Sequence, residues 1–340
     1  MNGSKRSWNR YWTPLGSLAV IFAAAAAAMA IGRFTIAPKE LAAVLIPGSF
    51  PDVQVSGQVR TVISNIRFPR VVLALLSGAG LAAAGAAFQG LFANPLATPD
   101  TLGAANGASF GAVLGILLGL PAFGIQTLAM ITGVAAVLMA WSVAQVRGTI
   151  PPLMVILAGM VVSSLFSALV SLVKYAADPQ DVLPSITYWL MGSMASTTRT
   201  TLIMGAPFIL AGSLLLFLLR WKLNTMSLPE DEAKSLGIPV KRIRSLVILG
   251  AAMVTAAVVS MCGQIGWIGL LIPHMVRMIF GNDNRSVVPA SMASGALFML
   301  IIDTAARSVM ATEIPVSILT SLIGAPCFIL LLRKTGGIRL

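Results

Sequence analysis

The sequence predicts an all-α membrane protein whose chain crosses the bilayer about ten times. Of its 340 residues, 57% are hydrophobic and only 10% are charged, and the apolar runs are continuous rather than alternating. A soluble domain carries roughly 25% charged residues, so a water-soluble fold is excluded. Because the bilayer core offers no water to backbone amides, a spanning chain must be helical or a closed barrel, and continuous apolar runs are typical of helices.

Charge-free runs mark the expected spans, because a helix needs roughly 20 apolar residues to cross a membrane. They lie at 15–32, 71–92, 103–120, 124–146, 152–173, 200–219, 287–306 and 314–332. The stretch 245–276 carries no formal charge and is interrupted by Gly263-Gln264-Ile265-Gly266. It is therefore expected to hold two helices, at least one of them short or discontinuous. Residues 1–340 are expected to form a single transmembrane domain.

The positive residues set the expected orientation of the spans. With a cytoplasmic N-terminus, 15 of the 23 Lys and Arg residues fall on the inner side and 8 on the outer side, in the sense of the positive-inside rule. Both termini are therefore expected in the cytoplasm. Lys5, Arg6 and Arg10 before an Ala-rich stretch would also suit a cleaved signal peptide, but the many similar segments that follow favour an uncleaved first span.

The remaining composition narrows the class of function. The formal charge of +12 is spread singly or in short clusters between apolar runs, which argues against nucleic-acid binding. Cys262 and Cys327 lie inside apolar runs and are expected to pack rather than to form a disulfide. Asp303 is a carboxylate within an apolar run, a position that is functional by default. Arg307, one turn later, is its expected ion-pair partner.

The longest polar segment, 220–244, is expected to connect two spans on the cytoplasmic side. Its acids come first and a glycine-proline stop comes last: Glu230, Asp231, Glu232, Lys234 and Gly237-Ile238-Pro239. Acids at the start and a glycine at the end predict a short amphipathic helix. Such a helix is either a solvated loop without a partner or a docking element for a cytoplasmic motor.

Several blocks of the chain resemble those of the FecCD-type permease family, the permeases of iron-siderophore, haem and vitamin B12 ABC importers. The segment from Glu232 to Gly237 looks like the family's EA-x-x-LG coupling loop. The other blocks follow in the family's order: Arg67-Phe68-Pro69-Arg70, Gly85 to Gly90, Asn94-Pro95-Leu96-Ala97, Gly263 to Leu270 with Pro273-His274-Met275-Val276-Arg277, Asp303 to Arg307, Glu313-Ile314-Pro315 and Leu322 to Pro326. Together they cover essentially residues 60–335.

The resemblance implies a ten-helix subunit of the cell inner membrane that imports an iron complex, a siderophore or haem, with cobalamin or molybdate as alternatives. It implies a second permease copy in a homodimer, two copies of an ATP-binding subunit, and a periplasmic or lipid-anchored substrate-binding protein. The sequence holds no G-x-x-x-x-G-K-[ST] motif, so ATP hydrolysis is assigned to the separate subunit. The chain itself is expected to be no enzyme and to need no catalytic residue, cofactor or metal ligand.

Residue roles follow from the matching motif positions. Docking of the binding protein is implied for Arg67, Arg70 and Arg307, with snorkelling to lipid headgroups as the alternative. Asn94 and Leu96 match the cytoplasmic gate, although Asn-Pro is equally typical of a turn. Coupling to the ATPase is implied for Glu230, Asp231, Glu232, Ala233, Leu236 and Gly237 within the cytoplasmic segment 220–244. Packing near that segment is expected for Pro273, His274 and Arg277, because a lone histidine is more often structural than a ligand.

Two other classes of protein stay open at this point. A secondary transporter driven by an ion gradient would need charges buried at mid-membrane and no motor segment. An intramembrane enzyme would need paired His, Glu or Asp residues within the spans, which this sequence lacks. Residues 174–178 and 188–192 are expected along the outer part of the route. The loop 148–152 departs from the family pattern and receives no role.

Overall fold

The computed structural model describes residues 5–46, 48, 50–145, 151–226, 228 and 230–334, with the side chains of 5–15, 152, 230, 332 and 334 outside the description. Over this range every regular element is a helix, so the predicted all-α class is confirmed. The elements are α1 (Lys5–Ala30), α2 (Pro38–Leu45), α3 (Gly57–Thr61), the π-helix η1 (Val62–Arg67), α4 (Phe68–Leu91), the 3-10 helix η2 (Pro99–Leu102), α5 (Ala104–Leu117), α6 (Ala122–Ala144), α7 (Pro152–Ala176), α8 (Val182–Leu190), α9 (Arg199–Leu223), α10 (Glu230–Ser235), α11 (Val240–Cys262), α12 (Ile268–Phe280), α13 (Asn284–Ser308) and α14 (Val316–Lys334).

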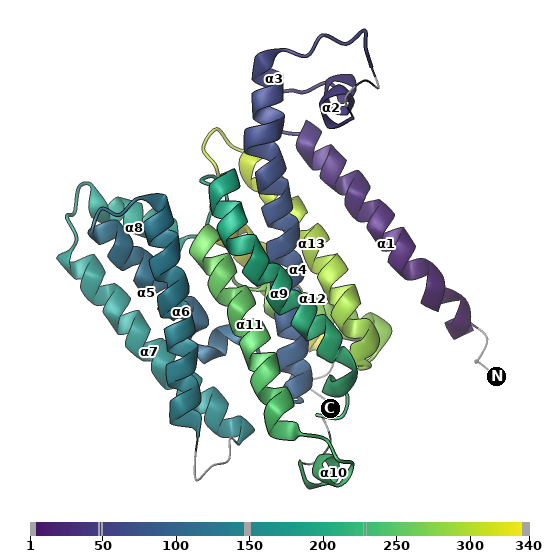
Figure 1. Cartoon of the computed structure of the whole chain (residues 1–340), viewed down its shortest axis with the longest axis vertical. Coiled ribbons are helices and arrows are strands. Elements are labelled where there is room, and N and C mark those ends of the chain that lie inside the picture. Colours follow the sequence, from purple (N-terminus) through teal and green to yellow (C-terminus); the bar gives the residue numbers. More distant parts are fainter. Residues whose placement is uncertain are drawn as a thin grey trace.

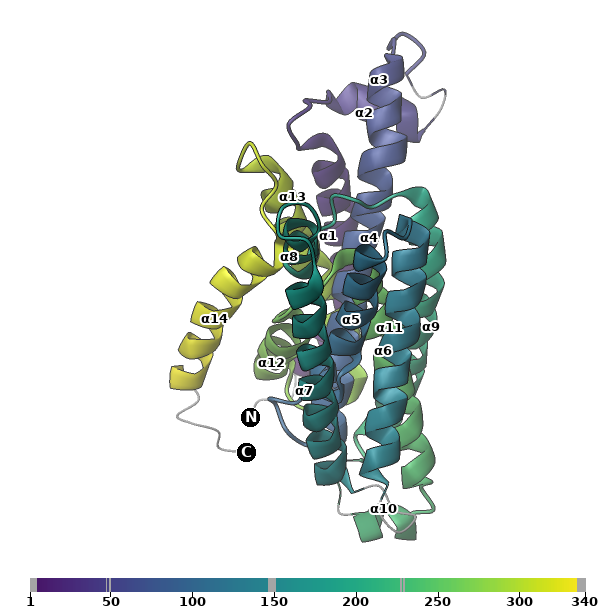
Figure 2. The ribbon, with the colours of Figure 1, turned by 90° about the vertical axis from the view of Figure 1, so that its left-hand side faces the viewer.

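The apolar helices account for the predicted spans. Six helices are long and apolar enough to cross a membrane, and four shorter apolar helices accompany them within the described chain. Each span expected from the sequence falls on one of these helices. In both views α10 lies at the lower end of the bundle, whereas α2 and α3 lie at the upper end (Figures 1 and 2). These two ends are called the α10 end and the α3 end below.

The expected interruption of the stretch 245–276 is confirmed. Helix α11 ends at Cys262 and α12 begins at Ile268. Between them Gly263 has a φ of +71°, a left-handed conformation that glycine adopts without steric cost. Helix α12 has 13 residues and therefore rises only about 20 Å, less than the thickness of a bilayer core.

The sequence did not predict α2, α8 or the extension of α4 by α3 and η1. The continuous helical stretch Gly57–Leu91 has 35 residues, and α3 carries it beyond the neighbouring helices with α2 beside it (Figure 1). Charged residues such as Lys39 and Arg60 made these segments look like loops. α8, in contrast, carries no charged residue, but its 9 residues are too few for a membrane span.

Helix α4 is the centre of the bundle. It packs against α13, α9, α11 and α12, and 78% of its most apolar window is buried within the chain. Helices α4 and α12 approach so closely that a Cβ atom on Gly85 would collide with the carbonyl oxygen of Gly269. The two glycine-rich blocks found in the sequence therefore mark one helix contact.

Helices α7 and α14 lie at the margin of the bundle. Only 28% of the most apolar window of α7 is buried, and α14 contacts only α12 and α13 to any extent. Figure 2 shows α14 leaning away from the other helices at its C-terminal end, on the side that α7 and α12 also face. Large apolar side chains are exposed on both helices, among them Leu157, Val161, Leu322 and Leu330.

Candidate functional site

Three arginines at the α3 end are buried rather than exposed. Arg67, Arg70 and Arg307 have 5%, 5% and 8% of their surface exposed. Together with Asp303 and Glu313 they form what we call the arginine cluster. The sequence had predicted an outward or headgroup-facing position for the three arginines, and in this structure their side chains are instead engaged within the chain.

Two members of the arginine cluster cap the C-terminal end of α1. The guanidinium of Arg67 donates to the carbonyl oxygens of Met29 at 2.6 Å and Ala30 at 2.8 Å, and also to that of Phe34. Arg307 donates to the carbonyl of Ile31 at 2.7 Å and to that of Ala28. The last carbonyls of a helix lack intrahelical donors and carry partial negative charge, so two cations there stabilise the end of α1.

The third arginine joins two carboxylates. Arg70 Nε lies 2.8 Å from Asp303 Oδ1, and its Nη1 lies 2.9 Å from Glu313 Oε2. The predicted pair of Asp303 and Arg307 is confirmed, with Nε and Oδ2 3.5 Å apart. Asp303 is fully buried, and its charge is balanced by two guanidinium groups. Glu313 lies in one of the family-like blocks, but the sequence analysis did not pair it with Arg70. The two residues are 243 positions apart, so no local pattern indicates their contact.

At the α10 end, the predicted short helix of the segment 220–244 is present as α10. Ala233 is 1% exposed and anchors α10 to the bundle, whereas Leu236 is 66% exposed. Gly237 ends the helix with a φ of +74°. Asp231 and Glu232 are exposed, and the side chain of Glu230 lies outside the described residues. The segment therefore exposes two acidic side chains and one leucine.

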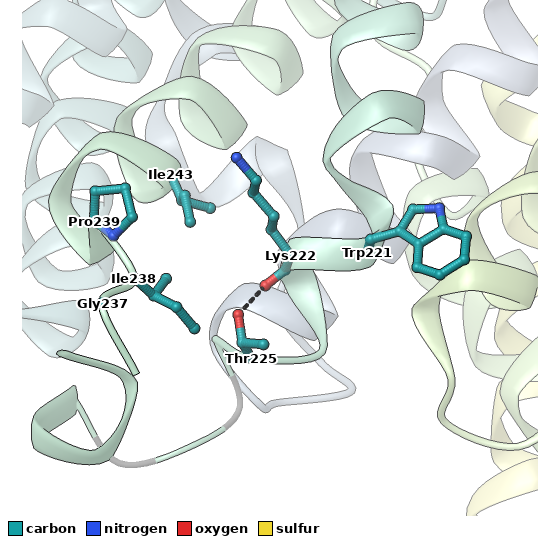
Figure 3. A pocket seen from close by; sticks show the side chains of 7 residues that line it. All are labelled: Trp221, Lys222, Thr225, Gly237, Ile238, Pro239 and Ile243. Atoms are coloured by element: carbon teal, nitrogen blue, oxygen red, sulfur yellow. Dashed lines mark hydrogen bonds between the residues drawn. The ribbon is translucent and has the colours of Figure 1, made fainter. Parts of the chain in front are cut away.

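A cavity of about 350 Å³ lies beside α10, between the end of α9 and the start of α11 (Figure 3). Its lining is mostly apolar and comes from Trp221, Lys222, Thr225, Gly237, Ile238, Pro239 and Ile243. Trp221 also lies under the guanidinium of Arg285, 4.5 Å from the ring centroid. The segment 220–244 thus combines a protruding helix with an adjacent hollow.

The turn after α4 has the geometry expected for Asn-Pro. Asn94 Oδ1 accepts a hydrogen bond from the backbone N–H of Leu96 at 2.9 Å, and Asn94 N–H donates to the carbonyl of Gln89 at 3.2 Å. Leu96 is 43% exposed. Asp100, in η2, is exposed.

Close to this turn, Arg277 of α12 is the centre of a hydrogen-bond network. Its Nη2 donates to the carbonyl of Ala86 at 2.9 Å and to Asn284 Oδ1 at 2.8 Å, and its Nε donates to Gln89 Oε1 at 3.2 Å. The backbone N–H of Asn284 donates to Asn224 Oδ1 at 2.8 Å, and Asn224 Nδ2 donates to Asp283 Oδ1 at 2.7 Å. We call these residues the amide network.

The sequence predicted packing for Pro273, His274 and Arg277. Pro273 is buried, and the His274 ring meets Phe328 of α14 edge-on at 5.8 Å. Arg277 instead makes the specific contacts just described. Asn224 and Asn284 escaped the sequence analysis because a single asparagine beside a span carries no pattern of its own. Among the described residues no group of three His, Cys, Asp or Glu side chains could hold a metal ion.

The interrupted spans, buried ion pairs and protruding α10 together define a polytopic membrane protein of the transporter type. A model of the FecCD transport family matches residues 18–334. The chain is 39% identical over 307 residues to the molybdate import system permease protein MolB of Haemophilus influenzae, covering 90% of each. It is 37% identical over 277 residues to a probable iron chelatin transport system permease protein of Helicobacter pylori, covering 82% of this chain and 84% of that one.

Structure comparison agrees with the sequence matches. A solved inward-facing conformation of a metal-chelate type ABC transporter superposes with a TM-score of 0.83 at 38% identity, covering 94% of this chain and 98% of the other. The chain therefore belongs to the FecCD transport family.

Proposed function

We propose that this protein is the permease subunit of an ATP-driven importer, and that the segment 220–244 is where a separate ATPase subunit docks. The observation that carries this proposal is the construction of α10. Ala233 fixes the helix to the bundle, whereas Leu236 is 66% exposed next to exposed acids. α10 is thus held at a fixed position outside the bundle while its acids and Leu236 stay accessible to another protein, and family membership supports the same role.

The cavity beside α10 suits the proposed ATPase contact. It opens between α9 and α11, and Figure 3 shows Trp221 and Ile243 on either side of Lys222. An apolar side chain of the ATPase would fill the hollow while α10 enters the ATPase. Two interlocking contacts would transmit force better than one, because a rigid pair resists rotation about either contact.

We further propose that a second copy of the chain completes the route, giving a homodimer served by two ATPase subunits. Helices α7 and α14 support this, since both lie at the margin of the bundle (Figure 2) and expose large apolar side chains. Asn94 and Leu96 would then form the gate at the α10 end. Leu96 is exposed enough to close against its copy, and an apolar gate closes without holding water.

The proposed contact with a substrate-binding protein lies at the α3 end. Arg67, Arg70 and Arg307 would have to leave their partners in the arginine cluster to meet it directly. We therefore propose that they hold α1 in place beneath the docking surface, and that the exposed cations Arg33, Lys39 and Arg60 provide the electrostatic attraction. These three side chains lie on or next to α2 and α3, which project furthest at this end (Figure 1).

The proposed cargo is a metal complex. The relatives named above are a molybdate import permease and a probable iron chelatin permease, and others are named for cobalamin and hemin. Iron chelate and molybdate are therefore compared first, with haem and cobalamin as alternatives. An ion-gradient-driven transporter is disfavoured, because the carboxylate of Asp303 is held between Arg70 and Arg307 rather than free to bind an ion. The chain is proposed to carry out no chemistry of its own.

The experiment is uptake into vesicles that contain the permease with its ATPase and binding protein. We expect accumulation of either a ferric chelate or molybdate only when ATP is present. A Leu236→Ser complex serves as the paired variant and should take up less cargo at limiting ATPase concentration, because its affinity for the ATPase should fall about tenfold. Accumulation by the permease alone, without nucleotide, would refute the proposal.

A further inference from the structure

The amide network connects the segment 220–244 to the turn at Asn94–Leu96. Asn224 lies within that segment, directly after the end of α9. Its Oδ1 accepts from the backbone of Asn284, and Asn284 Oδ1 accepts from Arg277. At the other end, the backbone carbonyl of Gln89 accepts from Asn94 N–H. An unbroken series of contacts therefore runs across the first turn of α13, α12 and the last turn of α4.

The acceptors of Arg277 allow its hydrogen bonds to be exchanged for others. Every hydrogen bond that the described structure gives its guanidinium ends on a neutral oxygen: the carbonyls of Ala86 and Asn282 and the side-chain amides of Gln89 and Asn284. No carboxylate fixes the guanidinium within the described chain, and its five donors can exchange one neutral oxygen for another. A group that must rearrange in every transport cycle needs this property.

We propose that Arg277, Asn284 and Asn224 are positioning residues that transmit movement of the ATPase-coupling segment to the gate turn at Asn94–Leu96. This inference rests on the proposed function. When the ATPase moves the end of α9, Asn224 displaces the first turn of α13. Arg277 then passes that shift through Gln89 to the backbone of the turn.

A packing role and a transmitting role differ in what a stronger contact would do. Asn284→Asp would keep the acceptor oxygen and add a negative charge next to Arg277, at the first position of α13, where an acid is favourable. A residue that only supports the fold would tolerate or gain from this change. A residue that must release its partner in each cycle would be locked by it.

The experiment compares Asn284→Asp and Asn284→Ala in the full complex with ATPase and binding protein. We expect both variants to hydrolyse ATP but to move about tenfold less cargo per ATP, and Asn284→Asp to unfold at a temperature no lower than that of the unchanged complex. The matched control is Asn282→Ala, an exposed asparagine that contributes only its backbone carbonyl to Arg277. Its transport per ATP should not change.

A second readout reports on the turn itself. Ala93→Cys, at an exposed position beside Asn94, is introduced after Cys262 and Cys327 are replaced by alanine. Its labelling rate with a water-soluble maleimide should change when an ATP analogue binds, and the Asn284 variants should abolish that response. Normal coupling and a normal labelling response in Asn284→Asp would overturn the relay. Absence of ATP-dependent uptake in the unchanged complex would instead refute the proposed function.

Discussion

The two ends of the molecule use buried arginine in opposite ways. In the arginine cluster, Arg70 and Arg307 meet the carboxylate of fully buried Asp303, and Arg67 meets the end of a helix. In the amide network, Arg277 meets only neutral oxygens within the described chain. Losing one partner of a buried ion pair leaves an unbalanced charge, whereas a guanidinium bound to amide oxygens can exchange one such oxygen for another. The comparison indicates a fixed α3 end and a rearranging α10 end.

The most damaging change should be one that removes a charge from the fixed end. Asp303→Asn leaves Arg70 and Arg307 buried without their shared counter-charge. We expect a loss of about 3–5 kcal/mol of unfolding free energy, the usual result of breaking a buried ion pair on one side only. The measurement is thermal or denaturant unfolding of the purified protein in detergent.

Two further variants sharpen this result. Asp52→Asn is the control, because Asp52 is exposed at the same end and its change should alter stability by no more than about 0.5 kcal/mol. The double variant Asp303→Asn with Arg307→Gln should recover part of the loss, because Glu313 still balances Arg70 whereas Arg307 is left without a carboxylate. Equal stability of Asp303→Asn and Asp52→Asn would end the idea of a charge-fixed end.

A smaller loss should follow from releasing α1. Arg67→Met removes three hydrogen bonds to carbonyls at and beyond the end of α1, which predicts a loss of about 1.5–3 kcal/mol. Loss of these hydrogen bonds should also give faster amide hydrogen exchange in the last turns of α1. Arg33→Met is the matched control, since exposed Arg33 makes a single hydrogen bond to the carbonyl of Met310. Unchanged exchange in Arg67→Met would show that packing and the hydrogen bonds of Arg307 hold α1 without Arg67.

The sequence analysis anticipated the fixed and rearranging ends to different degrees. The spans and the break at Gly263 followed from charge-free runs and glycine, because the absence of water in a bilayer leaves few alternatives. The pair of Asp303 and Arg307 followed from its spacing of one helical turn. The acids at 230–232 and the glycine at 237 predicted the short helix α10. Each of these features is encoded in neighbouring residues.

The features that the analysis missed depend on residues far apart in the chain. Motif positions suggested an external role for Arg67 and Arg70, but nothing near them in the sequence shows that the end of α1 or Glu313 would cover them. Asn224 and Asn284 likewise meet only because the end of α9 lies beside the start of α13. Local pattern cannot show such contacts, since the packing of whole helices decides them.

The smallest expected change in stability, and the sharpest test of the α10 end, comes from Leu236→Ser. Leu236 is 66% exposed, so its replacement should alter the unfolding free energy by no more than about 0.5 kcal/mol. If α10 enters an ATPase subunit, the same change should weaken that association about tenfold, because burying a leucine side chain contributes about 1.5–3 kcal/mol and about 1.4 kcal/mol is a factor of ten. Ile46→Ser is the matched control at the opposite end, with 62% of its surface exposed. Co-purification of the ATPase at graded concentrations measures both variants, and an equal affinity of the two would mean that α10 is a solvated loop helix without a partner.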